Sequence, residues 1–308
     1  MSKPFLRFED GQISLGNKDL MVTSASLSIS PGLEPERVYG DYSPSIVGST
    51  AEFIDFAPKG GLAGKLEIKF MIIDETFDVD NNLANDINVL FDIRNGMSEE
   101  AIHGNIVGRY FFDNMYLNSF SFSLAPYRII QASASYDIYG SIYKAIDRRF
   151  QKTSIDPAHG LKSFGKIEAS NTSMQTANGR QFEVSQLDYS IRVGRKLHYH
   201  IRDGEHTRVA TGSNGIVPHR VSVENIEATM SLEGNDIVQK LNPYGEFQAG
   251  SGRASEAGRN SSVFAFLYTM SGKRIASFGC EGKITEQSVD ISEGNYAKGK
   301  LTVKQIIK

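Results

Sequence analysis

The chain has 308 residues, a hydrophobic content of 40% and a formal net charge of -3. This length suffices for about two domains, and the near balance of charge excludes a strongly basic nucleic-acid-binding protein as well as an acidic tail. The single cysteine, Cys280, excludes an intrachain disulfide framework and a multi-thiolate zinc site.

The composition also favours strands over membrane helices. Phe, Tyr and Gly are abundant, with 18, 13 and 29 residues, which suits strands joined by tight turns. The N-terminal sequence MSKPFLRFEDGQ lacks the apolar core of a secretory signal, and no apolar run approaches the roughly 20 residues of a membrane helix. We therefore expect a soluble protein that folds in a reducing cytoplasm.

Alternation of apolar and polar residues with a period of two is the dominant pattern, and it is clearest at 20–30, 117–124 and 131–139. Successive side chains of a strand point to opposite sides, so each segment has one apolar and one polar face. The sequence Ala-Pro-Tyr-Arg at 125–128 supplies a turn, which predicts a β-hairpin over 117–139. Further strands are predicted at 5–9, 62–73, 104–112, 182–193, 196–202, 221–232, 262–270, 274–280, 283–292 and 297–307.

Helical periodicity is limited to three short segments. In 83–91, Leu83, Ile87, Leu90 and Phe91 share one face of a helix, with Asn82 able to cap its start. Weaker candidates lie at 141–149 and 236–241. The fold class expected from these patterns is all-β with minor α.

The pattern repeats within the chain. Segments 117–124 and 132–139 can be laid over 284–291 and 299–306 at one offset of 167 residues. Segment 23–29 matches 226–232 at an offset of 203, which implies 36 additional residues in the first copy, including 83–91. We therefore predict two tandem β-sandwich or half-barrel domains, 1–152 and 182–308, joined by a linker or arm at 153–181.

The densest group of potential metal ligands is His198, His200 and His206. Three imidazoles on adjacent strands can bind zinc or iron. The Asp-Gly pair at 203–204 is however typical of a hairpin turn, and a half-exposed strand without metal is the favoured interpretation.

Other motifs for chemistry are absent from the sequence or incomplete. Cys280 has no histidine partner at a recognisable spacing and is predicted to be a structural thiol. The calcium-loop opening at 78–82 fails, because Leu83 stands where glycine is required and Val89 where glutamate is required. We therefore predict no catalytic site, no metal, no cofactor and no enzymatic activity.

The strand pattern resembles that of the tail tube proteins of long-tailed bacteriophages. The resemblance is carried by the opening strand at 20–30, the turn Val-Tyr-Gly-Asp-Tyr-Ser-Pro at 38–44, the strand at 104–112 and the Ser/Ala-rich hairpin that ends at Gly140. The second copy keeps an opening strand, Asn-Pro-Tyr-Gly at 242–245 and a closing hairpin. The likeness covers most of the chain outside 153–181 and resides in pattern rather than in an invariant motif.

The resemblance implies a specific assembly. Each unit would be a β-sandwich with a flanking helix, and six units would form a ring whose inner wall is a continuous β-barrel. In members with a duplicated unit, three chains make the ring, and stacked rings conduct DNA without binding it specifically. The protein would be a virion tail component made in the host cytoplasm, in contact with sheath, tape measure, baseplate or terminator proteins and with no membrane.

Candidates for the channel wall or assembly contacts are polar residues of the closing hairpins: Ser119, Ser121, Ser123, Ser133, Ser135, Asp137, Thr285, Asp290, Lys300 and Thr302. A hydrated wall with few cations would not grip phosphates. The hairpin elements 20–30, 117–139, 221–232 and 283–307 would line or support the channel, and 45–61 and 247–262 would contact other rings or a sheath.

Three alternatives remain open. One is an adaptor of the same fold at the tail end, baseplate or neck. Another is a receptor- or carbohydrate-binding pair of β-sandwiches, against which the absence of Trp counts. The third is a metal-dependent enzyme centred on His198, His200 and His206.

Overall fold

The structure is a computed structural model in which every described element is a β-strand. It describes residues 11–15, 18–30, 33–38, 53–58, 63–72, 89–94, 106–112, 115–125, 128, 130–139, 142–145, 163–170, 180–182, 184–199, 218–234, 260–269, 274–292 and 297–308. The strands in chain order are β1 (Gly11–Leu15), β2 (Lys18–Ser30), β3 (Leu33–Val38), β4 (Phe53–Pro58), β5 (Ala63–Met71), β6 (Val89–Arg94), β7 (Ile106–Phe112), β8 (Met115–Leu124), β9 (Gln131–Ile138), β10 (Ile142–Ala145), β11 (Ser163–Ser170), β12 (Arg180–Phe182), β13 (Gln186–His198), β14 (Arg220–Gly234), β15 (Asn260–Thr269), β16 (Arg274–Asp290) and β17 (Lys298–Ile307).

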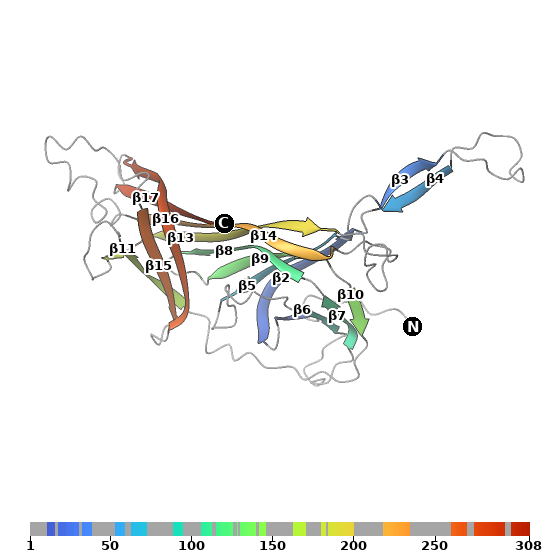
Figure 1. Cartoon of the computed structure of the whole chain (residues 1–308). Coiled ribbons are helices and arrows are strands. Elements are labelled where there is room, and N and C mark those ends of the chain that lie inside the picture. The colour runs from blue at the N-terminus through green and yellow to red at the C-terminus, as the bar shows by residue number, and fades with distance from the viewer. Residues whose placement is uncertain are drawn as a thin grey trace, which may run out of the picture.

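One large antiparallel sheet contains most of these strands. Its 15 strands follow the order β10-β7-β6-β1-β2-β5-β9-β8-β13-β14-β17-β16-β15-β11-β12. β3 and β4 pair only with each other, as a ribbon that projects from the rest of the molecule (Figure 1).

The alternating patterns do form strands, with one buried and one exposed face. In β5, Leu66, Ile68 and Phe70 are buried while Lys65 and Glu67 are exposed. The predicted pairs of strands at 182–193 with 196–202, and at 274–280 with 283–292, are single long strands, β13 and β16. In β13 a register shift between Gly194 and Arg195 lies at the predicted break. In β16 the predicted break at 281–282 lies next to Lys283, where the strand changes partners, and the register shift comes later, between Ile284 and Glu286. The predicted strand at 5–9 lies outside the described residues.

Two predicted helices are wrong where the structure describes them. Val89–Arg94 is strand β6, paired with β1 and β7, and Ile142–Ala145 is strand β10, paired with β7. Both segments are rich in Val, Ile, Phe and Tyr, which favour strands when neighbouring strands offer pairing, so long-range contacts override a short helical period. The part of the chain that the structure describes therefore contains no flanking helix. Residues 83–88, 146–149 and 236–241 lie outside that part.

The predicted linker or arm at 153–181 contributes to the sheet. β11 pairs with β15, and β12 pairs with β11. These residues thus pair within their own chain. The division of the chain into two domains at this segment stays a prediction.

Eight strands form two sets of four that lie side by side in the sheet, the first quartet (β2, β5, β9 and β8) and the second quartet (β13, β14, β17 and β16). All neighbours are antiparallel, so corresponding strands of the two quartets run in the same direction. A row of directly opposite apolar residues crosses each quartet. The two rows are Leu27, Leu66, Tyr136 and Leu117, and Tyr189, Met230, Val303 and Ile284.

The closing hairpins of the two quartets share the same irregularity. The register of β8–β9 shifts between Leu117 and Ser119, and that of β16–β17 shifts between Ile284 and Glu286, which is 167 residues later. The offset of 167 residues in the sequence pattern therefore also separates the register shifts of the two hairpins.

The predicted match of 23–29 to 226–232 is wrong. β14 pairs with β17 as β5 pairs with β9, so the counterpart of β14 is β5, at an offset of 164. The counterpart of β2 is β13, at an offset of 162. With these assignments the offsets are nearly constant, and the 36 additional residues are not required.

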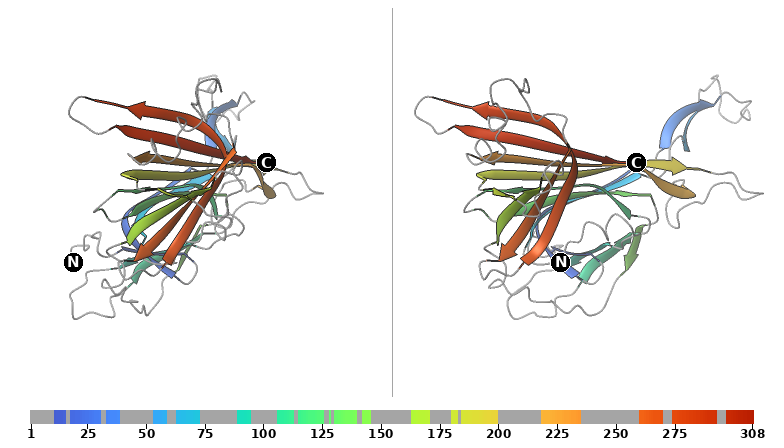
Figure 2. Two further views of the ribbon diagram at one scale, coloured as in Figure 1. Left: turned by 90° about the vertical axis from the view of Figure 1, so that its left-hand side faces the viewer. Right: turned by 60° about the vertical axis from the view of Figure 1, so that its left-hand side comes forward.

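β16 joins two layers of the fold. Its residues 274–283 pair with β15, and residues 283–290 pair with β17. Phe278 packs against Phe120, Phe122 and Tyr189, with ring centroids 5.7, 4.6 and 5.2 Å away. β15 and this part of β16 therefore cover the apolar face of the central strands, at an angle to them (Figure 2).

Gly282 lies where β16 changes partners, and a side chain there has no room. A Cβ atom at Gly282 would stand 2.1 Å from the carbonyl oxygen of Lys304. We expect Gly282→Ala to lower the free energy of unfolding by about 1–3 kcal/mol, because the β17 backbone must move. Urea unfolding at one protein concentration measures this, with Glu281→Ala, an exposed neighbour, as the control. Equal stability of the two variants would contradict the close approach.

Candidate functional site

The candidate channel residues come together on one side of the quartets. Ser121 lies opposite Ser133 on β9 and opposite Ser190 on β13. The same side carries Ser119, Ser123, Ser135, Asp137, Asp290, Lys300 and Thr302. We call this side of the two quartets the polar face. The other side carries the buried core.

Further residues of the polar face lie on strands that the sequence candidates omitted. Pairing links one polar row across seven strands. The row contains Ser24, Lys69, Ser133, Ser121, Ser190, Thr229 and Lys304. The alternation of β13 and β14 was visible in the sequence, but their position beside β8 and β17 was not. The pairing is therefore what adds Ser190 and Thr229 to the surface.

Thr285 sits at the register shift of β16 rather than in the regular row. Its Oγ1 donates a hydrogen bond to the carbonyl oxygen of Thr302 at 3.4 Å. The residue at the corresponding shift of β8 is Asn118, whose Nδ2 donates to Asp137 Oδ2 at 2.7 Å. Both bulge residues therefore brace the facing strand of their own hairpin.

Four lysines of the polar face are paired with glutamates. Lys298 Nζ lies 3.6 Å from Glu233 Oε1, Lys300 Nζ 3.1 Å from Glu286 Oε1, and Lys304 Nζ 3.0 Å from Glu227 Oε1. In the first quartet Lys65 contacts Glu67. Such exposed pairs add little stability, but they neutralise cations that otherwise attract phosphates.

Hydrogen bonds extend the pairing around Glu286. Thr302 Oγ1 donates to Glu286 Oε2 at 3.2 Å and lies 3.1 Å from Ser231 Oγ. The hydrogen bond and charge of Lys300 lower the pKa of Glu286, so this carboxylate stays ionised and keeps Lys300 neutralised at neutral pH.

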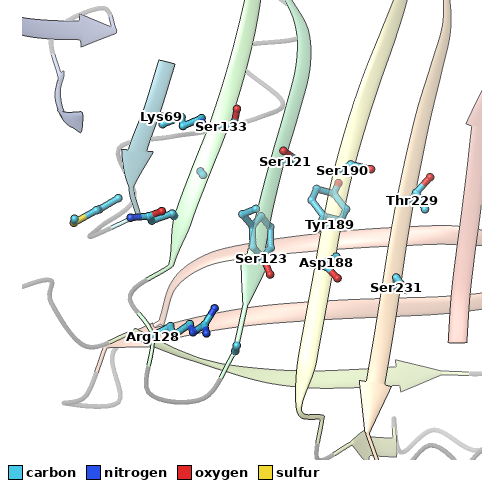
Figure 3. Close-up of a pocket in the computed structure, with 15 residues that line it drawn as sticks. Lys69, Ser121, Ser123, Arg128, Ser133, Asp188, Tyr189, Ser190, Thr229 and Ser231 are labelled. Atoms are coloured by element: carbon cyan, nitrogen blue, oxygen red, sulfur yellow. The ribbon is translucent and has the colours of Figure 1, made fainter. Parts of the chain in front are cut away.

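The polar face is hollowed in its middle. A hollow of about 820 Å³ lies over β5, β9, β8, β13 and β14 (Figure 3). It is lined by serines and Thr229, by Lys69, Arg128 and Asp188, and by apolar residues that include Met71, Phe122 and Tyr189. Hydroxyl groups bind water as readily as they bind a ligand. The hollow extends across the place where the two quartets meet, and its hydroxyl groups can hold water there.

A polar cluster fastens β13 to β8 at one end of that meeting line. Arg195 Nη2 donates to the carbonyl oxygen of Leu117 at 3.1 Å, and its guanidinium lies 4.8 Å from the ring centroid of Tyr116. Asp137 accepts a hydrogen bond from the Tyr139 hydroxyl at 3.2 Å. Burial raises the pKa of Tyr139, and Asp137 raises it further, so the phenol stays protonated and continues to donate.

The alternative metal site is only partly within the described residues. His198 lies on β13, where Nε2 is 2.8 Å from Ser222 Oγ. His200 and His206 lie outside the described part of the chain. Among the residues that the structure describes, no three His, Cys, Asp or Glu side chains are grouped as a metal site.

The sequence comparisons add no relative. A scan against protein-family models gave no match, and a search of curated proteins gave none either. Within the described ranges, no helix is long and apolar enough to cross a membrane.

Cys280 is buried between strands rather than exposed in a site. Its Sγ lies 3.5 Å from the carbonyl oxygen of Ala228 and 3.4 Å from that of Val303, and burial raises its pKa from 9.0 to about 11. We expect native Cys280 to react with a thiol reagent at least about 100-fold more slowly than in denaturant at pH 8, since reaction requires the thiolate. The rate should rise with pH up to the raised pKa. Rapid labelling of the native protein would contradict a structural thiol.

Proposed function

We propose that the protein is a structural subunit of a bacteriophage tail tube, in which three chains form a ring around a DNA channel. The single observation that carries the proposal is the side-by-side repetition of two quartets in one sheet, with equal strand direction, matching register and one continuous polar face. The proposal includes two tandem units, each a β-sandwich with one quartet in the inner wall, and the same repetition supports them.

Equal orientation of the quartets favours a ring. Two units related by a two-fold axis form a closed pair to which no third unit can be added in the same way. Units arranged head to tail instead leave one strand edge of each kind available for a further unit. A chain that already contains one such step can continue it with further chains. If the rotation at each step closes, a barrel forms and its strand edges disappear.

The polar face supports a wall along which DNA slides. Serine and threonine hydroxyls can hold water at the surface, and three lysines of β17 are paired with glutamates. DNA binding depends on cations that displace counterions from phosphates. Lysines that are already paired with glutamates bind the phosphates of passing DNA only weakly.

The proposed location and partners follow if the protein is a subunit of a tail tube. The protein would reside in the virion tail, after synthesis in the host cytoplasm, and would contact sheath, tape measure, baseplate or terminator proteins. The ribbon β3–β4 projects from the sheet and suits a contact with a neighbouring ring or sheath (Figure 1). No catalytic role is proposed.

Electron microscopy of the purified full-length chain tests the assembly. We expect rings with a central channel that stack into tubes, and a mass corresponding to three chains per ring. Single rings that never stack would instead identify an adaptor at the tail end, baseplate or neck. A protein that stays monomeric at high concentration would overturn the proposal.

Neutralisation of the wall can be tested separately in the assembled protein. We expect the triple variant Glu227→Gln, Glu233→Gln and Glu286→Gln to retain short duplex DNA about tenfold or more over the unmodified protein in low salt, because three lysines lose their partners. Co-sedimentation at two salt concentrations measures this, and retention should fall in high salt.

The matched control replaces the three lysines rather than the three glutamates. Lys298→Gln, Lys300→Gln and Lys304→Gln remove the same ion pairs without exposing cations. This variant should retain no more DNA than the unmodified protein. Equal DNA retention by both triple variants would show that the glutamates do not keep DNA from binding.

A further inference from the structure

The contact between the two quartets inside one chain is a template for a contact between chains. β8 pairs with β13 through Ser121 opposite Ser190, Phe122 opposite Tyr189 and Ser123 opposite Asp188. We call this β8–β13 contact the internal seam. It joins the last strand of the first quartet to the first strand of the second.

The two strands equivalent to the seam lie at the outer ends of the quartets. β16 corresponds to β8 and β2 corresponds to β13, at the offsets of 167 and 162 given by the registers. β1 pairs with β2 only at Lys18–Leu20, and β15 pairs with β16 only up to Lys283. Among the described strands, none adds a second ladder to β2 at 26–28 or to β16 at 288–290.

We propose that β16 of one chain pairs antiparallel with β2 of a second copy of the chain, in the register of the internal seam. Ser288 then lies opposite Ser28, Val289 opposite Leu27, and Asp290 opposite Ser26. This proposal rests on the proposed ring and adds to it the residues and register of the junction.

The residue types at both ends fit this register. The seam pair Ser121 and Ser190 has two serines, as does the pair Ser288 and Ser28. On the opposite side of the strands, Val289 and Leu27 are apolar, as their counterparts Phe122 and Tyr189 are. In these two pairs the polar face and the apolar face both continue across the junction. One residue further along, the register places Gln287, the counterpart of Phe120, opposite Ile29.

The seam pair Ser123 and Asp188 combines one hydroxyl with one carboxylate. The corresponding junction pair, Asp290 and Ser26, has the same two residue types with the strands exchanged. The register therefore places no two carboxylates opposite each other, an arrangement that would disfavour strand pairing.

Exposed apolar side chains provide a second, independent observation. Ile291 and Ile29 are 79% and 50% exposed at the outer edges of the second and the first quartet. Their seam counterparts, Leu124 and Ile191, are only 8% and 7% exposed. Large apolar residues exposed beside an open strand edge fit a surface that a neighbour covers. A second copy carries the complementary edge.

Cysteine crosslinking of the full-length chain tests the register. Opposite Cβ atoms in an antiparallel pair are about 4.5–5.5 Å apart, near the distance that a disulfide spans. Under mild oxidation, Ser28→Cys with Ser288→Cys should give covalent dimers and trimers in non-reducing electrophoresis. Cys280 is buried and adds no background. Ser121→Cys with Ser190→Cys should crosslink within one chain and verifies that this pair geometry is reactive.

Two controls separate register from proximity. Ser24→Cys with Ser288→Cys places the first cysteine on the same face but four residues, about 13 Å, from the aligned position, and should crosslink at least about tenfold less. A mixture of Ser28→Cys chains with Ser288→Cys chains should give heterodimers, whereas each variant alone should give none. Homodimers of either single variant would overturn the head-to-tail junction.

The outcomes distinguish this proposal from the proposed function. If microscopy shows rings but the aligned pair crosslinks no better than the displaced pair, the junction is wrong and the tube subunit stands. If neither rings nor intermolecular crosslinks form while the internal seam pair crosslinks, both proposals fail.

Discussion

The N–H and C=O groups along the edge of a strand must form hydrogen bonds with a neighbouring strand. This requirement determines the order of the strands in the structure. Each interior strand of the two quartets has a neighbour on both sides, and the internal seam between β8 and β13 lets two similar units share one sheet. Main-chain pairing is indifferent to side-chain identity, which explains why sparse sequence identity coexists with matching registers. The ladder, rather than any motif, is what the two halves of the chain have in common.

The two faces of the sheet that the quartets form differ in what they contact. On the apolar side Phe278 packs on Phe120, Phe122 and Tyr189, so β16 closes the second layer over the place where the quartets meet. On the polar side hydroxyl groups and paired charges surround a hollow. One strand pattern with period two thus supplies both a buried core and a polar surface. The proposed channel wall depends on this division between the two faces.

The sequence predicted the strands of the two quartets, the closing hairpins and the polar residues of β8, β9, β16 and β17, because alternation is a local property of the chain. It did not predict β1, β3, β4, β11 or β12. The serines of β8 and β9 were identified in this way, and they do lie together. The seam was not predictable, since nothing in residues 119–124 specifies that 187–192 will pair with them. The predicted helices at 83–91 and 141–149 failed for the same reason in their described parts, because partners distant in the sequence decided the local structure. The match of β2 to β14 failed because alternating strands resemble one another, and only the register tells them apart.

The two halves differ mainly where the chain leaves the quartets. In the second half β16 runs without interruption from β15 to β17, whereas in the first half the corresponding residues belong to two strands, β7 and β8. The bulge of the closing hairpin is nevertheless kept at the same position in both. A bulge increases the local twist of a strand, and this twist determines the rotation from one strand of the sheet to the next. In a ring every step must be alike for the barrel to close, so the proposed assembly constrains the quartets most strongly and leaves the outer connections free to diverge.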